Sequence, residues 1–368
     1  MRQSYITNMI AVFFGGRSCE HDISIITGLQ AMAACPVKYK CVGVYIDPDG
    51  VWWAANADKF DNASAVRNKK FDGKRVHIRP DGALYCKNKR LGKIDVALLC
   101  MHGMMGEDGT LQGMLEMCGI PYTGSGVAAS AVGMNKLRSK AVFERAGLKV
   151  LPYIQVLRNE YYADAAITVK LVTELGYPVI VKPCNLGSSI GISMANDEAE
   201  LFKALRIAFE WDDTVIVEKA LTDFIEVNCA VLGDENGELT VSDTEQPVGW
   251  EHFLTFSDKY AGDVKSTRHK IPADVGDEIN SEIQKQAKIA FEAIGCSGVA
   301  RIDFLVYNEL VYINEINTIP GSLANGLFKS NMNFTKLIDR LIECASDRKR
   351  RADALKRVYT PVIPIVGK

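Results

Sequence analysis

Two carboxylates and an amide alternate with an arginine along a predicted hairpin in the last third of the chain. Arg301 and Asp303 share one face of the first strand, and Glu315 and Asn317 share one face of the second. A three-residue loop over 308–310 would pair Asp303 with Glu315, whereas a two-residue loop would shift the pairing by one position and disperse the group. The first pairing places the two carboxylates ~5 Å apart. A hard cation would neutralise them, and oxygen ligands suit magnesium better than zinc. The alternative is a solvated charged edge, which the apolar neighbours disfavour.

A glycine-rich loop between two strand-like runs is the second chemical feature. It extends from Lys182 to Gly191 and contains Ser188 and Ser189 after Gly187. Glycines permit backbone conformations that turn N–H groups toward one point, and with the serine hydroxyls these groups can form a nest for an anion. The loop does not match G-x-x-x-x-G-K-[ST], which excludes a Walker-type P-loop. A tight hairpin without a ligand is the alternative. Combined with a magnesium-type cluster, the loop favours a nucleoside triphosphate held through its phosphates.

The segments that position these residues alternate between strand-like and helix-like patterns. An apolar run over 9–16 ends in glycines, and a helix-like segment over 22–35, with Asp22 or Ser24 as its N-cap, leads to a strand over 40–47. Alternation of this kind predicts an α/β domain with a parallel sheet, here over 1–125. Residues 243–272 are polar and irregular, and such long loops are often lids.

Composition narrows the class of protein. The 368 residues are 48% hydrophobic and 24% charged, and the formal net charge is −2. Length predicts roughly two to three domains, and the near-neutral charge disfavours nucleic-acid binding. No apolar run reaches the ~18 residues of a membrane span, so we expect neither nucleic acid nor membrane as a partner. The ten cysteines include no C-x-x-C pair, which predicts reduced thiols and a cytoplasmic location.

Eight motifs, in order between about residues 10 and 330, resemble those of the D-alanine–D-alanine ligases, members of the ATP-grasp superfamily. The motifs lie at residues 15–24, 102–109, 121–126, 135–140, 181–191, 259–260, 301–304 and 315–321. The resemblance implies a Rossmann-like domain over 1–125 and a two-part ATP-grasp (α+β) module. The module would consist of a central subdomain over 126–215 and a C-terminal subdomain over 216–368 that carries the lid and the magnesium site.

The same resemblance implies a reaction. ATP would phosphorylate the carboxylate of one D-alanine, and the amine of a second would attack the acyl phosphate to give D-alanyl-D-alanine for peptidoglycan precursors. A free carboxylate is a poor acyl donor, which is why ATP is required. Two Mg²⁺ ions, with Mn²⁺ as a substitute, would be held by Asp303, Glu315 and Asn317. A homodimer built on the first domain is expected.

The resemblance assigns further residues to ATP and the two amino acids. Glu218 would accept the adenine amino group and Glu226 would bind the ribose. The expected ATP contacts are Lys136, Lys182, Ser188, Ser189, Glu218, Glu226 and Lys259. The expected catalytic residues are Glu20, Ser188, Tyr260, Arg301 and Gly321, of which Arg301 and the Gly321 N–H would stabilise the oxyanion. The expected substrate contacts are Glu20, His102, Lys259, Arg301, Gly321, Gly326 and Leu327.

One departure from the family pattern concerns the second substrate. A serine usually binds its carboxylate where this chain has Gly326, and the missing hydroxyl removes a hydrogen bond of about 1.5–3 kcal/mol. Ser322, Asn325 or Lys259 would compensate, or the acceptor is D-serine, another amino acid or a hydroxy acid. A catalytically inactive nucleotide-binding regulator is a further alternative. A nicotinamide oxidoreductase rests only on the glycine pattern at 124–129, which we interpret as a turn and helix start.

Overall fold

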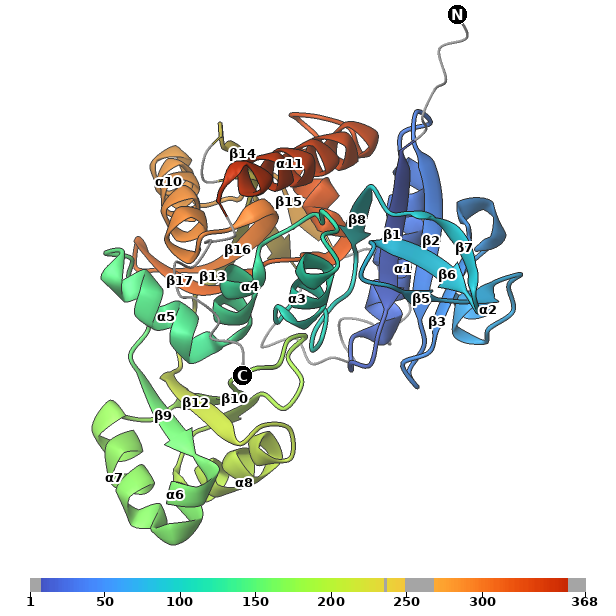
Figure 1. Ribbon diagram of the computed structural model, residues 1–368. Coiled ribbons are helices and arrows are strands. Elements are labelled where there is room, and N and C mark those ends of the chain that lie inside the picture. The colour runs from blue at the N-terminus through green and yellow to red at the C-terminus, as the bar shows by residue number, and fades with distance from the viewer. Residues whose placement is uncertain (1–7, 235–236, 249–267, 357–368) are drawn as a thin grey trace, which may run out of the picture.

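The computed structural model describes residues 8–234, 237–248 and 268–356. Its N-terminal part is a five-stranded sheet with the order β4-β3-β2-β1-β8 (Figure 1). β1 (Met9–Gly15) is parallel to β2 (Lys40–Ile46) and to β8 (Val96–Leu99), as the alternating pattern predicts. β3 (Trp52–Asn56) and β4 (Lys74–Arg75) add an antiparallel edge that was not predicted.

Helix α1 (His21–Ala34) covers one face of this sheet, and all seven residues of β1 are buried. The N-cap residue of α1 is Glu20 and no side chain caps the helix, so the predicted capping by Asp22 or Ser24 is wrong. Ser24 is instead buried, where its hydroxyl accepts from the Gly15 N–H (2.8 Å) and donates to the Cys100 carbonyl (2.7 Å). These two bonds fix α1 to the ends of β1 and β8.

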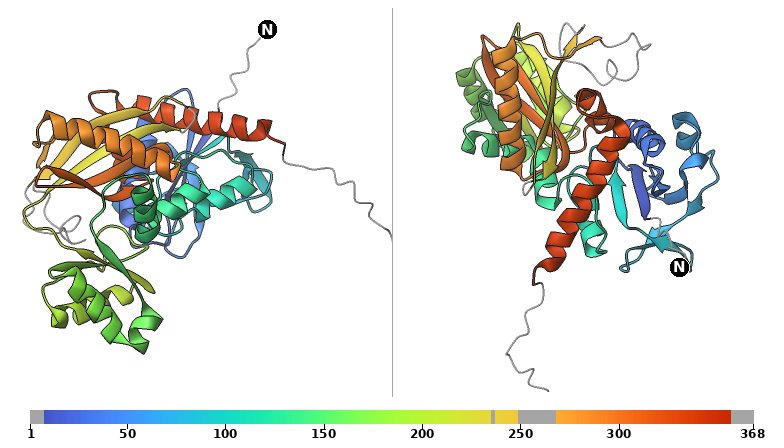
Figure 2. Two further views of the ribbon diagram at one scale, coloured as in Figure 1. Left: turned by 90° about the vertical axis from the view of Figure 1, so that its left-hand side faces the viewer. Right: turned by 90° about the horizontal axis from the view of Figure 1, so that it is seen from above.

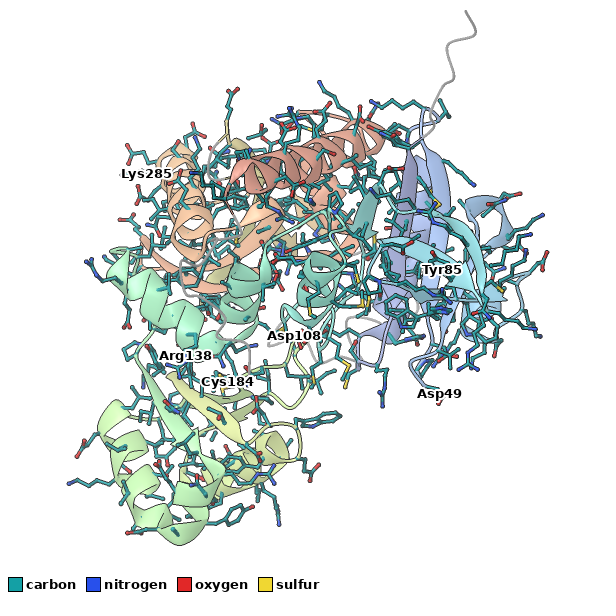
Figure 3. The ribbon with its side chains drawn as sticks, in the orientation of Figure 1. Asp49, Tyr85, Asp108, Arg138, Cys184 and Lys285 are labelled. Atoms are coloured by element: carbon teal, nitrogen blue, oxygen red, sulfur yellow. The ribbon has the colours of Figure 1, made fainter. Side chains whose placement is uncertain are left out.

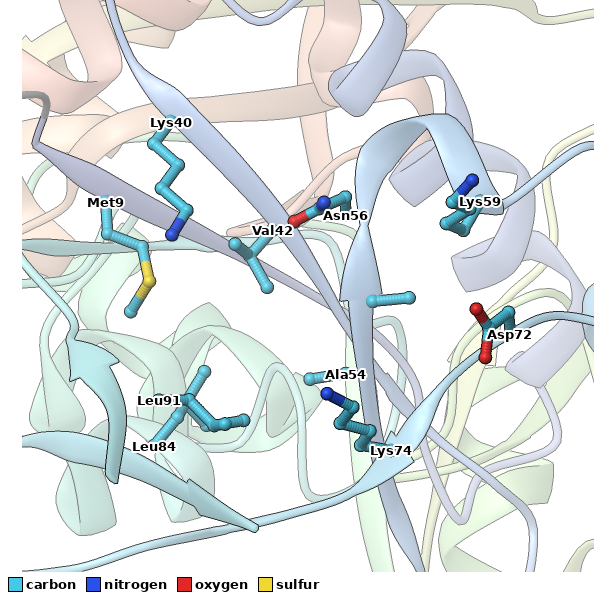
Figure 4. Close-up of a pocket in the computed structure, with 11 residues that line it drawn as sticks. Met9, Lys40, Val42, Ala54, Asn56, Lys59, Asp72, Lys74, Leu84 and Leu91 are labelled. Atoms are coloured by element: carbon cyan, nitrogen blue, oxygen red, sulfur yellow. The ribbon is translucent and has the colours of Figure 1, made fainter. Parts of the chain in front are cut away.

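The opposite face carries a small sheet of β5 (His77–Ile78), β6 (Ala83–Cys86) and β7 (Lys89–Lys93). A cleft of about 340 Å³ lies beside it, and Lys40 and Lys74 are among its lining residues (Figure 4). The cleft lies near the beginning of β1, whereas Glu20 follows the end of that strand. It is therefore separate from the residues that the sequence singles out. The short elements of this part are η1 (Ala57–Lys59), α2 (Ala63–Arg67) and α3 (Thr110–Met117).

The central part is an antiparallel sheet with the order β11-β10-β12-β9. Its strands are β9 (Tyr153–Leu157), β10 (Val179–Pro183), β11 (Ser193–Ala195) and β12 (Thr214–Lys219). Its helices are α6 (Arg158–Ala163), α7 (Ala165–Leu175) and α8 (Glu198–Phe209). Apolar residues of α8 at helical spacing, Leu201, Leu205 and Phe209, pack with the strands into a separate core.

The C-terminal part is a sheet with the order β15-β14-β13-β16-β17. Its strands are β13 (Ile225–Asp234), β14 (Thr240–Val248), β15 (Arg268–Lys270), β16 (Ser297–Tyr307) and β17 (Leu310–Asn317). Helices α4 (Val127–Met134), α5 (Lys136–Arg145) and α10 (Asp277–Ile294) pack on one face. The segment η2 (Gly321–Phe328) and helix α11 (Phe334–Ala354) pack on the other face and share a core with the N-terminal part (Figure 2).

Two expectations concern single segments. The region 243–272 was expected to be irregular, but its described ends belong to β14 and β15, which pair from Gln246–Lys270 to Val248–Arg268. The rest of that region, 249–267, lies outside the described residues. The ten cysteines are all free, as predicted. Among the helices of the described residues, none has the length and hydropathy of a membrane span.

Candidate active site

The hairpin of β16 and β17 brings the predicted cluster together. Asp303 pairs with Glu315 and Arg301 with Asn317, as expected. The predicted three-residue loop is wrong, because only Asn308 and its neighbour form the turn, both with left-handed φ (48° and 63°). A β-bulge supplies the missing residue, since the pairing shifts by one between Asp303 and the next position of β16. The cluster residues therefore share the sheet face opposite α10.

Arg301 and Asp303 form a bidentate ion pair within this cluster. The guanidinium donates from Nε to Oδ1 (2.6 Å) and from Nη2 to Oδ2 (2.7 Å), and Asn317 Nδ2 donates to Oδ2 (3.0 Å). Burial acts to lower the pKa of Arg301, but the Asp303 charge outweighs burial and raises it. Because the Asn317 nitrogen is used by Asp303, its carbonyl oxygen remains as a donor for a cation.

The donor set of the cluster fits magnesium. Within the ranges that the structure describes, no three His, Cys, Asp or Glu side chains form a metal-binding group. The available donors are thus the carboxylates of Asp303 and Glu315 and the amide of Asn317. A set this small leaves coordination positions for phosphate oxygens and water, which is how magnesium is commonly bound with nucleotides.

The glycine-rich loop meets the N-terminal part at Glu20, which is buried. Ser188 donates a hydrogen bond to the Glu20 carboxylate, so the structure brings these two predicted residues together. The left-handed positions are Ser188 (φ 52°), Ser189 (φ 57°) and Gly191 (φ 71°), not Gly187. Gly187 packs tightly against Glu20, because a Cβ there would lie 3.0 Å from Glu20 Oε2 and the carboxylate would have to shift.

A network of buried charged side chains adjoins this loop. Glu218 Oε2 accepts from Lys182 Nζ (2.7 Å), and Lys140 Nζ lies 3.3 Å from Glu218 Oε1. Burial acts to raise the pKa of Glu218, but the two lysines outweigh burial and lower it to about 2. The bulge residue Asn314 also accepts from Lys182 (3.3 Å). Lys136 donates to a carbonyl of the glycine-rich loop (2.6 Å).

Lys140 lies within the motif at residues 135–140, and no role was predicted for it. Its side chain is 1% exposed, and burial lowers its pKa. Its position four residues after the buried Lys136, and three before the buried Phe143, was the available signal. All three side chains lie on the helix face that packs against the rest of the protein.

Two loops of the N-terminal part complete the site. His102 is buried and its Nε2 lies 2.8 Å from Thr27 Oγ1, and burial lowers the pKa of the imidazole to about 4. Glu107 lies within the motif at residues 102–109, and no role was predicted for it. Its carboxylate accepts from the Gly103 N–H (2.8 Å) and the Ile319 N–H (3.2 Å), and burial, together with the Glu20 charge, raises its pKa to about 8.

The other predicted residues within the described part of the chain are Glu226, Gly321, Gly326 and Leu327. Glu226 lies near the start of β13, exposed, and its charge acts on Arg301. Gly321 begins η2, whereas the Leu327 side chain is buried in the shared core, so only its backbone can face a substrate. Lys259 and Tyr260 lie outside the described residues. Figure 3 places Cys184, near the start of the glycine-rich loop, between helix α5 and the strands of the central part.

Comparisons with known proteins agree with this arrangement. A family model described as the D-ala D-ala ligase N-terminus matches residues 9–125, and one described as the C-terminus matches residues 142–343. A D-alanine–D-alanine ligase of Chloroherpeton thalassium is 39% identical and is matched over 92% of this chain and 96% of its own length. That of Acetivibrio thermocellus is 37% identical, with the same two shares.

Solved structures of two ligases are also similar to this chain. The D-alanine–D-alanine ligase of Coxiella burnetii superposes with a TM-score of 0.82 at 28% identity, over 94% of this chain and 96% of that one. The VanG D-Ala:D-Ser ligase of Enterococcus faecalis gives 0.79 at 29% identity, over 92% and 99%. From its motifs, its fold and these matches, the chain belongs to the D-alanine–D-alanine ligase family and has the ATP-grasp fold.

Proposed function

We propose that this protein joins two D-alanine molecules into D-alanyl-D-alanine and converts ATP to ADP and phosphate. The observation that carries the proposal is the cluster of Asp303, Glu315 and Asn317 on one sheet face, beside the Arg301 guanidinium. The family membership supports it over nearly the whole chain. ATP is needed because a free carboxylate is a poor acyl donor, whereas a carboxylate with one phosphorylated oxygen is a good one.

The cluster would hold Mg²⁺, which supplies positive charge to the phosphates of bound ATP. Two ions are proposed, with Mn²⁺ as a substitute, and Asp303, Glu315 and Asn317 as protein ligands. Lys136 lies 3.8 Å from the Glu315 carboxylate, so it is suited to contact the phosphates beside the ions. Lys182 would add a second ammonium group from the end of β10.

The nucleotide would lie between the central and C-terminal sheets. Ser188 and Ser189 would donate to its phosphates from the left-handed turn of the glycine-rich loop. Glu218 would accept from the adenine amino group, since a carboxylate held by two lysines keeps further lone pairs. Glu226 would bind the ribose hydroxyls, and Lys259 would contact ATP from the lid.

The first D-alanine would bind through its ammonium group to Glu20, whose position Ser188 fixes. Arg301 and the Gly321 N–H would stabilise the tetrahedral oxyanion that forms when the second amine attacks. Tyr260 would complete the link from Glu20 through Ser188 to the lid, and lid closure would keep water from the acyl phosphate. His102 would lie near the carboxylate of the first D-alanine.

The second amino acid would bind beside Gly326 and the backbone of Leu327. A Cβ at Gly326 would meet no other atom within 4 Å, so the missing hydroxyl leaves space beside the acceptor. Ser322 and Asn325 are both partly exposed in η2, and with Lys259 they are the side chains that would replace it. D-alanine is the proposed acceptor.

The wider assignments are part of the same proposal. The three-part division at 1–125, 126–215 and 216–368, with a lid within 243–272, would place the active site where the parts meet. We also propose a cytoplasmic homodimer that acts in peptidoglycan synthesis. The ten free thiols support a reducing compartment.

The test is product identification. Purified protein receives ATP, Mg²⁺ and D-alanine, alone and with D-serine or D-lactate, and mass spectrometry identifies the products while phosphate release is measured. D-alanyl-D-alanine with one ADP per peptide bond is expected. A product found only with another acceptor would contradict D-alanine as the second substrate. Tight ATP binding without ADP formation under any condition would favour the inactive regulator.

A further inference from the structure

The proposed oxyanion donor, the Gly321 N–H, lies between two backbone amides that the N-terminal part holds. The Ile319 N–H donates to Glu107 Oε1 (3.2 Å), and the Ser322 N–H donates to Thr27 Oγ1 (3.2 Å). Residue 320 is proline and has no N–H. Among the described residues, the Gly321 N–H has no acceptor. It is thus the one N–H of this stretch that remains for a substrate.

A further contact holds the Thr27 side chain. Its Oγ1 lies 2.8 Å from the Nε2 of His102, which is buried. The same oxygen accepts from the Ser322 N–H. The group that holds the Ser322 amide is therefore itself held by a second buried side chain.

The chain after Gly321 adopts a conformation that needs such support. Ser322, Leu323 and Ala324 all have left-handed φ values (50°, 51° and 53°), and none of them is glycine. Consecutive residues of this kind are strained and persist only when their surroundings fix them. Leu323 is buried in the core that the N-terminal part shares with η2, and Thr27 lies fully buried on α1 beside that segment.

We propose that Thr27 and Glu107 are positioning residues that set the direction of the Gly321 N–H by holding the amides on either side of it. The inference rests on the proposed function, in which this N–H stabilises the oxyanion. The two side chains come from α1 and from the loop before α3, and both belong to the part of the chain that also carries Glu20. They would thereby fix the distance between the bound donor ammonium and the oxyanion position.

The first test is Thr27→Val, which keeps the shape of the side chain and removes the hydroxyl. We expect kcat for dipeptide formation to fall at least tenfold with the KM for ATP unchanged, because the affected N–H acts on the transition state. Thr27→Ser should restore kcat to within about threefold of the wild-type value. The matched control is Ser24→Ala, which removes a buried hydroxyl of the same helix that bonds only within the N-terminal part.

The second test is Glu107→Gln, measured at pH 9, above the pKa of Glu107. The ionised carboxylate accepts from both the Gly103 and the Ile319 amides, whereas a glutamine in the same orientation can accept from only one of them. It should lower kcat like Thr27→Val, and the double variant should lose less than the product of the two single losses, because both act through one N–H. The control is Asp108→Asn, since Asp108 accepts from the Met105 and Thr110 amides of its own loop.

A binding measurement separates positioning from a general structural role. A phosphinic acid analogue of the tetrahedral intermediate should bind Thr27→Val and Glu107→Gln at least tenfold more weakly than the wild type, whereas ATP binds all of them equally. If both variants had the same kcat and the same analogue affinity as the wild type, the inference would be overturned and the proposed function would stand. Equal loss of ATP and analogue binding would also overturn it. A wild-type protein that forms no dipeptide would instead refute the proposed function.

Discussion

Arg301→Lys separates the two tasks that the structure gives this guanidinium. Two of its N–H groups are used by the Asp303 carboxylate at 2.6 and 2.7 Å. Within the described ranges the other three donate to no other group, so they are available to the oxyanion. Lysine keeps the positive charge but lacks the planar fork, so it cannot bond both Asp303 oxygens and the oxyanion together. The variant therefore preserves the charge of the cluster and removes its geometry.

The expected losses differ for the two tasks. Loss of one oxyanion donor lowers kcat by about 10²–10³-fold, or about 2.7–4 kcal/mol. Loss of one charge-assisted bond to Asp303 costs about 1.5–3 kcal/mol, which should appear as a lower free energy of unfolding. ATP affinity should change less than about threefold, since the net charge beside the metal ligands is the same.

The assay measures initial rates of dipeptide formation at saturating ATP and D-alanine, together with ATP binding by calorimetry and unfolding by urea. Arg340→Lys is the matched control, because Arg340 is exposed and pairs with Glu343 on the surface of α11. If Arg301→Lys kept more than a fifth of the wild-type kcat, the oxyanion role would be refuted. If ATP affinity fell as much as kcat, Arg301 would belong to the nucleotide site.

Three further predictions concern single groups. Lys140→Met should lower the free energy of unfolding in urea by less than about 3 kcal/mol, because Glu218 still pairs with Lys182. Glu218→Gln should lower it by about 3–5 kcal/mol, because it leaves two buried lysines without a carboxylate. A larger loss for Lys140→Met than for Glu218→Gln would contradict the network. The folded pKa of His102 is about 4 and its ordinary value is 6.5, so the unfolded chain binds more protons between these values. Stability should therefore fall as the pH drops from 6.5 to 4, and His102→Gln should remove that part of the slope; an unchanged slope in urea midpoints would refute the assignment. Gly326→Ser should lower the KM for the second D-alanine in steady-state assays, and an unchanged value would place the acceptor elsewhere.

Alternation along strands made the cluster predictable from the sequence. Asp303 and Glu315 could be paired because residues two apart share a face, and the structure has that pairing. The turn and the bulge could not be distinguished, since a three-residue loop and a two-residue loop with a bulge at Asn314 both add one residue between the paired positions. The sequence thus predicted which residues pair at the site, but it did not predict the turn and the bulge that produce this pairing.

Contacts between distant segments were not predictable in this way. Thr27 and the Ser322 amide are 295 positions apart, and Glu107 and the Ile319 amide are 212 apart. No local pattern reports such a contact, because it depends on how η2 packs against α1 in the folded chain. Glu107 could only be noticed as an acidic residue within a glycine-containing motif, without a partner.

Counting bound cations tests the central claim most directly. Mn²⁺ is titrated into the protein with ATP and followed by electron paramagnetic resonance, for the wild type, for Glu315→Gln and for the control Glu309→Gln in the turn of the same hairpin. The wild type and the control should bind two Mn²⁺ per chain, and Glu315→Gln should bind at least one of them tenfold more weakly or not at all. Equal stoichiometry and affinity in all three proteins would contradict the account, because the carboxylate pair would then hold no cation.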